Sequence, residues 1–256
     1  FMESGWDLQR MQKQMLMSST YQQSSVVSPQ GWEVDPENRL LSRGPRFRLD
    51  AEIIRDQALF LSGLMHGTIG GPSVKPYQPA GLWKPVGFGG SNTSVFKQDS
   101  GEKLYRRSMY TFWKRTSPPP SMTTFDAPDR ETCQVRRART NTPLQALVLL
   151  NDVQFIEAAR KFAERIITEG GTSEEERLIF AFRSAVGRTP NQAELERLKR
   201  NLLEYQQHFD QQTEAASELL SVGESPVNQE LATKDTAAWT LIAHLLFNLS
   251  ETITRG

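Results

Sequence analysis

The stretch "TNTPLQALVLLNDVQFIEAARKFAERIITEGG", residues 140–171, decides the fold class of this chain. Thr142 is suited to an N-cap, Pro143 to the first helical position, and Gln145 to the third position of a capping box. Apolar residues then recur at helical spacing until Gly170 and Gly171 stop the pattern. The stretch therefore predicts one long core helix that begins at Pro143 and continues to the two glycines.

Further helices are predicted on both sides of this stretch. On the N-terminal side we expect one helix at about 6–20, a polar loop at 22–47, and a second helix that Asp50 begins and Gly63 ends. On the C-terminal side the patterns predict helices at about 173–186, 190–221 and 234–249, the second with a start signal at Thr189 and Pro190. Residues 103–115 are rich in aromatic side chains and form the best strand candidate.

These signals predict a mainly α fold: one mostly helical module over residues 1–256, with a minor β element near 103–115. Residues 143–256 are expected to form a C-terminal helical bundle. Residues 64–100, rich in glycine and proline, are expected to be a long irregular loop insertion. Such a segment in a compact domain is usually a functional loop or a mobile one.

The composition excludes several classes of protein. Thirty basic residues balance thirty acidic ones, so no global charge favours nucleic acid as a partner. No apolar run approaches the roughly 20 residues that a transmembrane helix needs. Cys133 is the only cysteine, which excludes an internal disulfide, a Cys-rich zinc site and a CxxCH haem attachment. We therefore expect no metal and no cofactor.

The acidic pair Asp126 and Asp129 is the first candidate for chemistry. The two carboxylates are three residues apart in "FDAPDRE", where they could perform acid–base catalysis or bind a divalent metal. His66, in the Gly-rich segment, could approach them in space. Alternatively, each carboxylate caps a turn or pairs with a nearby arginine, which would fix the loop against the core.

A cluster of arginines beside the start of the predicted long helix is the second candidate. Guanidinium groups match the geometry of phosphate or sulfate, and the start of a helix adds free backbone N–H groups. The alternative is that these arginines only satisfy nearby carboxylates. The candidate residues for an anion or ligand site are Arg130, Arg136, Arg137, Arg139, Asn141 and Thr142.

Three aromatic residues in the irregular segment, Tyr77, Trp83 and Phe88, form a third candidate. On an exposed loop they could stack on sugar rings, whereas in a packed loop they would attach it to the helical body. Cys133 lies among cations that would activate an exposed thiol, but no histidine or nucleophile signature accompanies it. We expect a packed, inert cysteine.

The segment "TSPPPSMTTFDAPDRETCQVRRARTNTPLQALVLLNDVQFIEAARKFAERI", residues 116–166, closely resembles the core of a planctomycete family of unknown function, the PSD-one family. The opening "GW…STYQQSS", "DPENRLLSR", "GGPSV" and the ending "AWTLIAHLLFNLSETITR" resemble it too. The resemblance implies that the chain begins inside the family's module and is N-terminally truncated. Family members are the C-terminal module of large exported proteins, behind a c-type cytochrome-like module.

From this resemblance we expect an exported, periplasmic or cell-surface protein, although this chain carries no signal peptide. Its expected role is a non-catalytic interaction or scaffold domain, linked to polysaccharide processing or to a cytochrome-containing assembly. The expected partners are other protein modules or carbohydrate. The alternative is a hydrolase acting on sulfated or acidic carbohydrate through Asp126, Asp129 and the arginines from Arg136 to Arg139.

Overall fold

The computed structural model describes residues 1–255, which form two compact units. Unit 1 comprises residues 1–48 together with the C-terminal residues from Thr254, and unit 2 comprises Leu49–Ile253. Over the described residues there are eleven α-helices and only two strands, each of two residues. The predicted mainly α fold with a minor β element is therefore confirmed.

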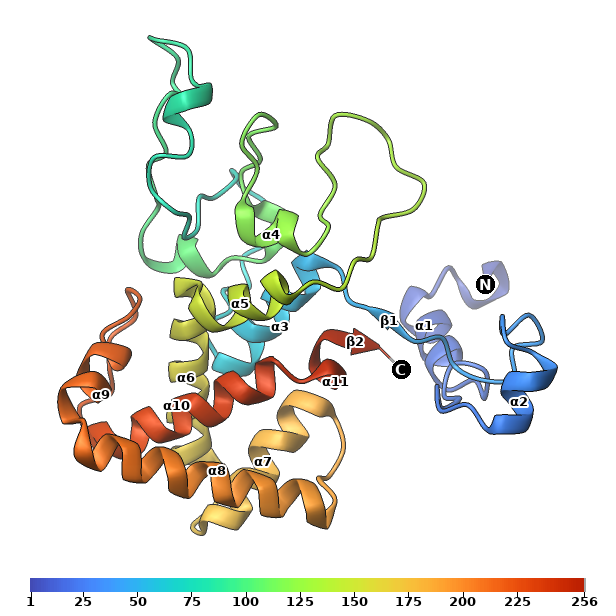
Figure 1. Ribbon diagram of the computed structural model, residues 1–256. Coiled ribbons are helices and arrows are strands. Elements are labelled where there is room, and N and C mark those ends of the chain that lie inside the picture. Colours follow the sequence, from blue (N-terminus) through green and yellow to red (C-terminus); the bar gives the residue numbers. More distant parts are fainter. Residues whose placement is uncertain (256) are drawn as a thin grey trace. The chain divides into compact units, whose positions relative to one another are not determined.

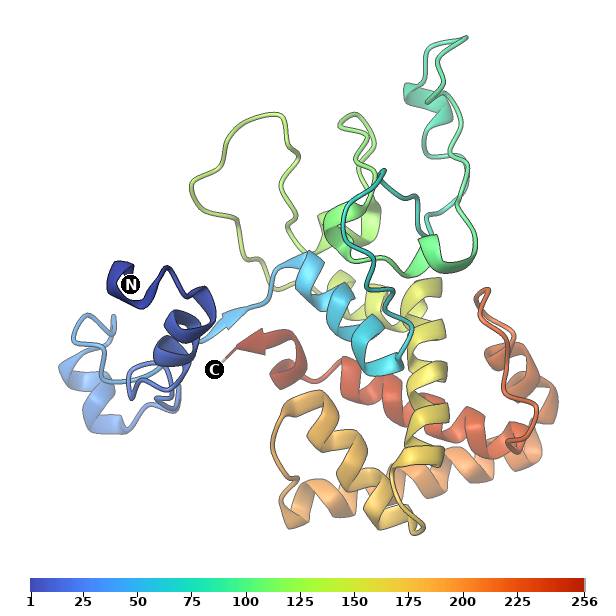
Figure 2. The ribbon, with the colours of Figure 1, turned by 180° about the vertical axis from the view of Figure 1, so that it is seen from behind.

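Two helices that cross at the centre of unit 2, α6 (Val153–Glu169) and α10 (Thr233–Phe247), organise its helical part (Figures 1 and 2). Ten residues of each helix are buried, so each is covered on most sides. The helices that surround this pair are α3 (Ala51–Ser62), α5 (Pro143–Asn151), α7 (Glu174–Val186), α8 (Gln192–Gln211) and α9 (Thr213–Leu220), with the short helices α4 (Pro120–Thr124) and α11 (Ser250–Ile253).

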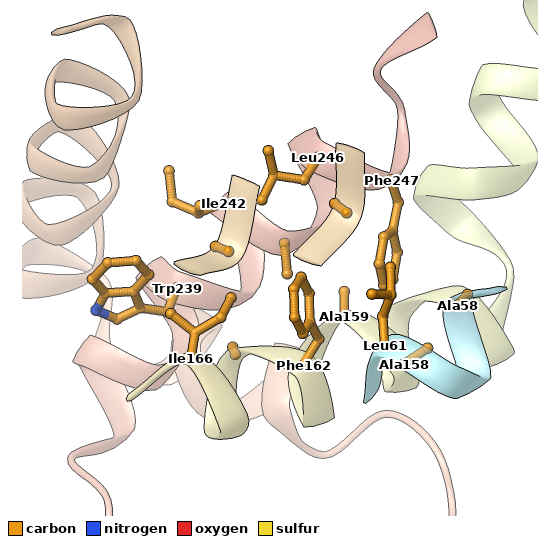
Figure 3. Packing of buried hydrophobic residues seen from close by; sticks show 14 of the residues in the cluster. Ala58, Leu61, Ala158, Ala159, Phe162, Ile166, Trp239, Ile242, Leu246 and Phe247 are labelled. Atoms are coloured by element: carbon orange, nitrogen blue, oxygen red, sulfur yellow. The ribbon is translucent and has the colours of Figure 1, made fainter. Parts of the chain in front are cut away.

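The core lies where α6, α10 and α3 meet (Figure 3). The rings of Phe162 and Phe247 stack with their centroids 5.9 Å apart and an angle of 7° between their planes. Trp239 and Ile166 are fully buried beside them. Alanines at 158 and 159 let the helices approach closely enough for these large side chains to interdigitate.

The long helix predicted from Pro143 to the two glycines is instead two helices, α5 and α6. Asp152 ends the first and begins the second in an extended conformation, with ψ at 130°. Its side chain accepts a hydrogen bond from the backbone N–H of Gln154 at 3.0 Å. An aspartate competes with the helical backbone in this way, so "ND" at 151–152 is a helix junction. The capping box of Thr142 and Gln145 is present as predicted.

A second junction divides the helix predicted at 190–221. Gln212 leaves the helical region between α8 and α9, with φ at −128°. The start signal also lies two residues further on than expected, because Asn191 caps α8 and forms a capping box with Glu194. Helix α7 is bounded as predicted, by a capping box of Ser173 and Glu176 at its start and by Gly187 at its end.

The strand predicted near 103–115 does not form, and the β pairing of this segment is limited to two isolated parallel bridges, of Arg106 with His66 and of Thr111 with Val74. Two 3₁₀ helices occupy this segment, η3 (Gly101–Tyr105) and η4 (Ser108–Tyr110). The carbonyl groups of Leu104 and Arg106 accept hydrogen bonds from the buried guanidinium of Arg55, at 2.7 and 2.9 Å, so these backbone groups are satisfied without a neighbouring strand. The strands that do form are β1 (Phe47–Arg48) and β2 (Thr254–Arg255), which pair antiparallel in unit 1.

Unit 1 contains two short α-helices joined by irregular chain. Helix α1 (Leu8–Leu16) is shorter than the predicted helix at 6–20, because Asp7 caps it by accepting from the N–H of Arg10 at 3.0 Å. Helix α2 (Pro29–Val34) lies within the predicted loop at 22–47, where Ser28 caps it. A 3₁₀ turn, η1 (Met2–Ser4), precedes α1.

Replacing Phe162 with alanine tests the packing of α6 on α10. The side chain is fully buried against Phe247, so Phe162→Ala is expected to lower the free energy of unfolding by about 3–5 kcal/mol. Urea unfolding followed by circular dichroism measures the change. Phe60→Ala is the matched control, because Phe60 on α3 is 69% exposed and its loss is expected to cost less than about 0.5 kcal/mol. Similar losses in both variants would contradict this description of the core.

His244, buried on α10, makes the stability depend on pH. Burial lowers the pKa of His244 from 6.5 to about 4, against an opposing hydrogen bond to the backbone of Phe155. The unfolded chain therefore takes up a proton at a higher pH than the folded chain. This contribution to stability is complete above pH 6.5 and is lost as the pH falls toward about 4, and it amounts to roughly 3 kcal/mol.

The measurement is the free energy of unfolding across that pH range for the wild type and for His244→Gln. The variant is expected to lose less stability on acidification, because the amide does not titrate. His208→Gln, exposed on α8, is the control and should keep the wild-type slope. An unchanged slope in His244→Gln would show that another group sets the pH dependence.

Candidate functional site

The loop over residues 127–139 is closed at its base by three side chains. Asp126 accepts hydrogen bonds from the backbone N–H of Thr140 at 2.8 Å and from its hydroxyl at 3.0 Å. The buried amide of Gln145, on the first turn of α5, donates to the carbonyl oxygens of Thr124 at 3.0 Å and Thr140 at 3.2 Å. The two ends of the loop are thus joined, and the loop projects from unit 2 (Figure 1).

Arg137 attaches the returning arm of this loop to helix α3. Its guanidinium forms a two-pronged ion pair with Glu52, with N–O distances of 2.6 and 3.2 Å, and Asp50 lies 3.6 Å away. The hydrogen bond with Glu52 raises the pKa of Arg137. Burial acts to raise the pKa of Glu52, but the hydrogen bonds and positive charge of Arg137 outweigh it and the pKa is lowered. Arg137 is therefore a structural ion-pair partner.

Asp129 and its neighbours are held against Trp113. The indole N–H of Trp113 donates to the carbonyl oxygen of Asp129 at 3.0 Å, and the guanidinium of Arg130 lies 4.5 Å from the centre of the ring. The carboxylate of Asp129 accepts from the N–H of Glu131 at 2.9 Å, and Glu131 is 3.5 Å from Arg115. Asp126 and Asp129 therefore have separate partners.

Other predicted residues of this loop lie on the surface. Asn141 and Thr142 are exposed at the start of α5, where Thr142 is the N-cap. The thiol of Cys133 is free and exposed, which corrects the expectation of a packed cysteine, because the loop projects away from the core. Val135 is fully exposed beside it. The exposed arginines are Arg130, Arg136 and Arg139.

His66 lies with Thr68 and Glu102 rather than with either aspartate. The hydroxyl of Thr68 is 2.6 Å from Nε2 of His66, and a carboxylate oxygen of Glu102 is 3.4 Å from the same nitrogen. A relay would need the hydroxyl and the carboxylate on different ring nitrogens. The three residues are therefore a polar surface cluster without the geometry of a nucleophilic triad.

Of the three aromatic candidates, Trp83 is almost completely buried, at 1% exposure. Its ring contacts Phe96 and Phe112 with centroid distances of 5.1 and 5.5 Å. The ammonium groups of Lys114 and Lys75 lie 4.9 and 5.7 Å from its centre. Trp83 thus attaches the irregular segment, as the alternative interpretation supposed, and its faces are covered by these neighbours.

Phe88 is 85% exposed in a narrow projection, residues 84–97, which we call the finger (Figure 1). The two arms of the finger meet at Gly87, where a Cβ atom would lie 2.8 Å from the Cα of Ser94. Lys114 donates to the carbonyl oxygen of Thr93 at 2.7 Å from outside the finger. Because the finger is held in this way, Phe88 is displayed at a fixed position.

Sequence reasoning missed a buried polar cluster on α6. Glu157 and Arg160 are each 1% exposed, and Glu157 accepts from the hydroxyl of Tyr105 at 2.9 Å and from the N–H of Ser225 at 2.6 Å. Arg160 donates to the carbonyl oxygen of Ser225 at 2.7 Å. The available signal was the placement of these charges on the apolar stripe of a helix, three residues apart.

Tyr77 belongs to the same cluster. Its hydroxyl accepts from the N–H of Glu224 at 2.7 Å. Burial, with the charge of Glu157 as the second cause, raises the pKa of Tyr77 to about 12, and the same two causes raise the pKa of Tyr105. Both phenols therefore stay protonated at neutral pH, as hydrogen-bond donors. The cluster joins residues 77, 105 and 224–225 to α6.

Of the three aromatic candidates, Phe88 is the one whose side chain is exposed. Within residues 1–255, no group of three or more His, Cys, Asp and Glu side chains is arranged to hold a metal ion. Among the helices described, none combines the length and the apolar character needed to cross a membrane.

Comparison with protein families identifies the class of this chain. The model of the PSD1 family, described as "Protein of unknown function (DUF1553)", matches residues 1–202. The chain therefore belongs to this family. The match includes residues 1–48 of unit 1, the finger, the loop at 127–139 and helices α3 to α7 of unit 2, and it ends within α8. No curated protein and no solved structure matches the chain.

The closure of the loop at 127–139 by Asp126 can be tested by proteolysis. Asp126 has φ at 58°, so Asp126→Gly removes the carboxylate without backbone strain. We expect the loss of its bonds to Thr140 to cost about 1–3 kcal/mol and to accelerate trypsin cleavage after the loop arginines. Asp129→Gly is the control, because the carboxylate of Asp129 bonds only two residues away, to Glu131. Equal cleavage rates in both variants would contradict the role of Asp126.

Proposed function

We propose that this chain is a non-catalytic interaction module of an exported protein. The proposal rests on one observation: the carboxylates of Asp126 and Asp129, the two candidates for catalysis, form hydrogen bonds that hold their own loop. Both oxygens of Asp126 accept from Thr140, and Asp129 accepts from Glu131. Arg137, at the centre of the candidate anion site, is paired with Glu52. A catalytic pair would need carboxylate oxygens directed at a shared substrate.

The exposed aromatic side chain of Phe88 supports a role in binding. The finger presents Phe88 on a backbone that Gly87 and Lys114 fix, and an aromatic ring held in this way loses little conformational entropy on binding. From the resemblance of its sequence we infer a planctomycete origin and a role beside polysaccharide processing or a cytochrome-containing assembly. The partners we propose are carbohydrate or other modules of such an assembly.

A hydrolase acting on sulfated or acidic carbohydrate is the second candidate. One observation favours it: Asp126 and Arg130 both have positive φ, at 58° and 64°. Non-glycine residues in this region cost about 1–3 kcal/mol and are frequent at active sites. In this loop the bonds of Asp126 to Thr140 and the contact of Arg130 with Trp113 offset that cost. We therefore favour the interaction module.

Binding and turnover on the same polysaccharides separate the two candidates. The full chain is incubated with dextran sulfate, alginate and unsulfated dextran, and both bound protein and released sulfate or reducing ends are measured. We expect binding without release, and about tenfold weaker binding for Phe88→Ala. Phe60→Ala, an exposed phenylalanine on α3, is the control and should bind as the wild type does.

Release of sulfate or reducing ends that disappears in Asp129→Asn, while the urea midpoint is unchanged, would replace the interaction module with the hydrolase. Binding to dextran sulfate that Phe88→Ala does not weaken would mean that the finger is not the binding element.

A further inference from the structure

The positive charge of unit 2 is concentrated in its irregular half, residues 64–142. This half carries twelve basic and five acidic residues, a net charge of +7. The remaining parts of unit 2, residues 49–63 and 143–253, carry eleven basic and twenty acidic residues, a net charge of −9. A polyanion is therefore attracted to the irregular half and repelled by the rest of the unit.

In the finger, positive charge is not opposed by any acidic residue. Residues 84–97 include Lys84 and Lys97 and neither aspartate nor glutamate. Both lysines are exposed, and among residues 1–255 no carboxylate forms an ion pair with either of them. Their ammonium groups are therefore available to a ligand that also contacts Phe88, which lies between them in the chain.

Two further lysines lie at the base of the finger. Lys114 donates to the carbonyl oxygen of Thr93 at 2.7 Å, and its ammonium group lies 4.9 Å from the centre of the Trp83 ring. The ammonium group of Lys75 lies 5.7 Å from the same centre. The acidic residue closest to the finger in sequence, Asp99, accepts from the backbone N–H of Lys75 at 2.8 Å. One carboxylate thus accompanies four lysines on and around the finger, and the unbalanced charge favours an anionic ligand.

The loop at 127–139 brings more positive charge to the same end of unit 2. In both views it projects at this end together with the finger, and α7 and α8 lie at the other end (Figures 1 and 2). It carries four arginines and two acidic residues, one of which, Glu131, lies 3.5 Å from Arg115. Arg136 is exposed, and no carboxylate of the described residues pairs with it. A long ligand bound at the finger can therefore extend toward a second cationic element.

We propose that the finger and the loop at 127–139 form a binding surface for a sulfated polysaccharide. Lys84 and Lys97 pair with sulfate groups, while the ring of Phe88 lies against the apolar face of a sugar ring. Arg136 contacts a sulfate group further along the same polymer, through the fork of its guanidinium. The inference rests on the proposed role as an interaction module and names the class of its ligand.

The shape of this surface favours a polysaccharide over other polyanions. Among the aromatic side chains of residues 64–142 only Phe88 is exposed, whereas proteins that bind single-stranded nucleic acid stack successive bases on several rings. A folded acidic protein needs a continuous patch of roughly 800 Å², which two narrow projections do not form. A linear polysaccharide can contact the two projections in turn. Sulfate groups raise its charge density, and with it the attraction to this half of unit 2.

The affinity of the full chain for dextran sulfate and for unsulfated dextran, measured at low and at physiological salt, tests the proposal. The wild type is expected to prefer dextran sulfate, and the preference should fall as salt screens the charges. The double variant Lys84→Gln, Lys97→Gln is expected to bind dextran sulfate about tenfold more weakly at low salt. The matched control is Arg197→Gln, Arg200→Gln, which removes two exposed positive charges from α8 and should bind as the wild type does. The urea midpoint shows whether each variant remains folded.

Three results would overturn the proposal. The first is equal affinity of the two double variants for dextran sulfate, which would show that net charge and not the finger governs binding. The second is equal affinity of the wild type for dextran sulfate and dextran. The third is tighter binding of oligodeoxythymidylate than of dextran sulfate, which would assign the surface to nucleic acid. Arg136→Gln is expected to weaken binding about threefold, and an unchanged affinity would remove the loop at 127–139 from the surface.

The same measurements separate this inference from the proposed function. Phe88→Ala should weaken binding but keep the preference for dextran sulfate, because the ring carries no charge, whereas Lys84→Gln, Lys97→Gln should reduce that preference. Binding of both dextrans without any preference overturns the inference and leaves the interaction module intact. Release of sulfate or reducing ends overturns the interaction module itself.

Discussion

The irregular half of unit 2 depends on buried guanidinium groups that donate hydrogen bonds to backbone carbonyl oxygens. A chain outside regular secondary structure has no ladder partners for these oxygens, and each one buried unpaired costs about 1–3 kcal/mol. Arginine is suited to this task because one side chain carries five N–H donors. Arg55, Arg106 and Arg160 each reach carbonyl groups of a segment distant in sequence: 104–106, 68–72 and 225–226 respectively. Burial lowers the pKa of Arg55 to about 10, which still leaves it charged at neutral pH.

Helix ends could be predicted from the sequence because capping is local, and the junctions inside helical patterns could not. The capping boxes at Thr142 and Ser173 involve residues three apart, so the signal and its partner are read together. Asp152 interrupts a continuous apolar stripe, and the stripe alone does not tell a cap from an exposed polar residue. The segment at 103–115 was wrongly predicted as a strand for another reason. The guanidinium of Arg55, which donates hydrogen bonds to carbonyl oxygens of this segment, lies about fifty residues earlier in the chain.

The candidate site shows the same division between local and distant partners. That the carboxylates would be paired was foreseen as an alternative, but the partner of Arg137 proved to be Glu52 on α3, and that of Asp126 proved to be Thr140. Trp83 and Phe88 are five residues apart in the same Gly/Pro-rich segment, yet one is buried and the other is exposed. Composition cannot distinguish them, because the difference arises from Phe96 and Phe112 closing around the first ring.

The two units differ in where their large apolar side chains lie: those of unit 2 form a buried core, and those of unit 1 are exposed. In unit 2 the large apolar side chains are collected between α6 and α10, so its projecting loops are positioned by a core that needs no partner. In unit 1 the local fold comes from polar contacts around Asp35, and the tryptophans remain on the surface. Apolar area that stays exposed in this way is a source of favourable free energy for association, since burial of apolar area is the main favourable term in binding.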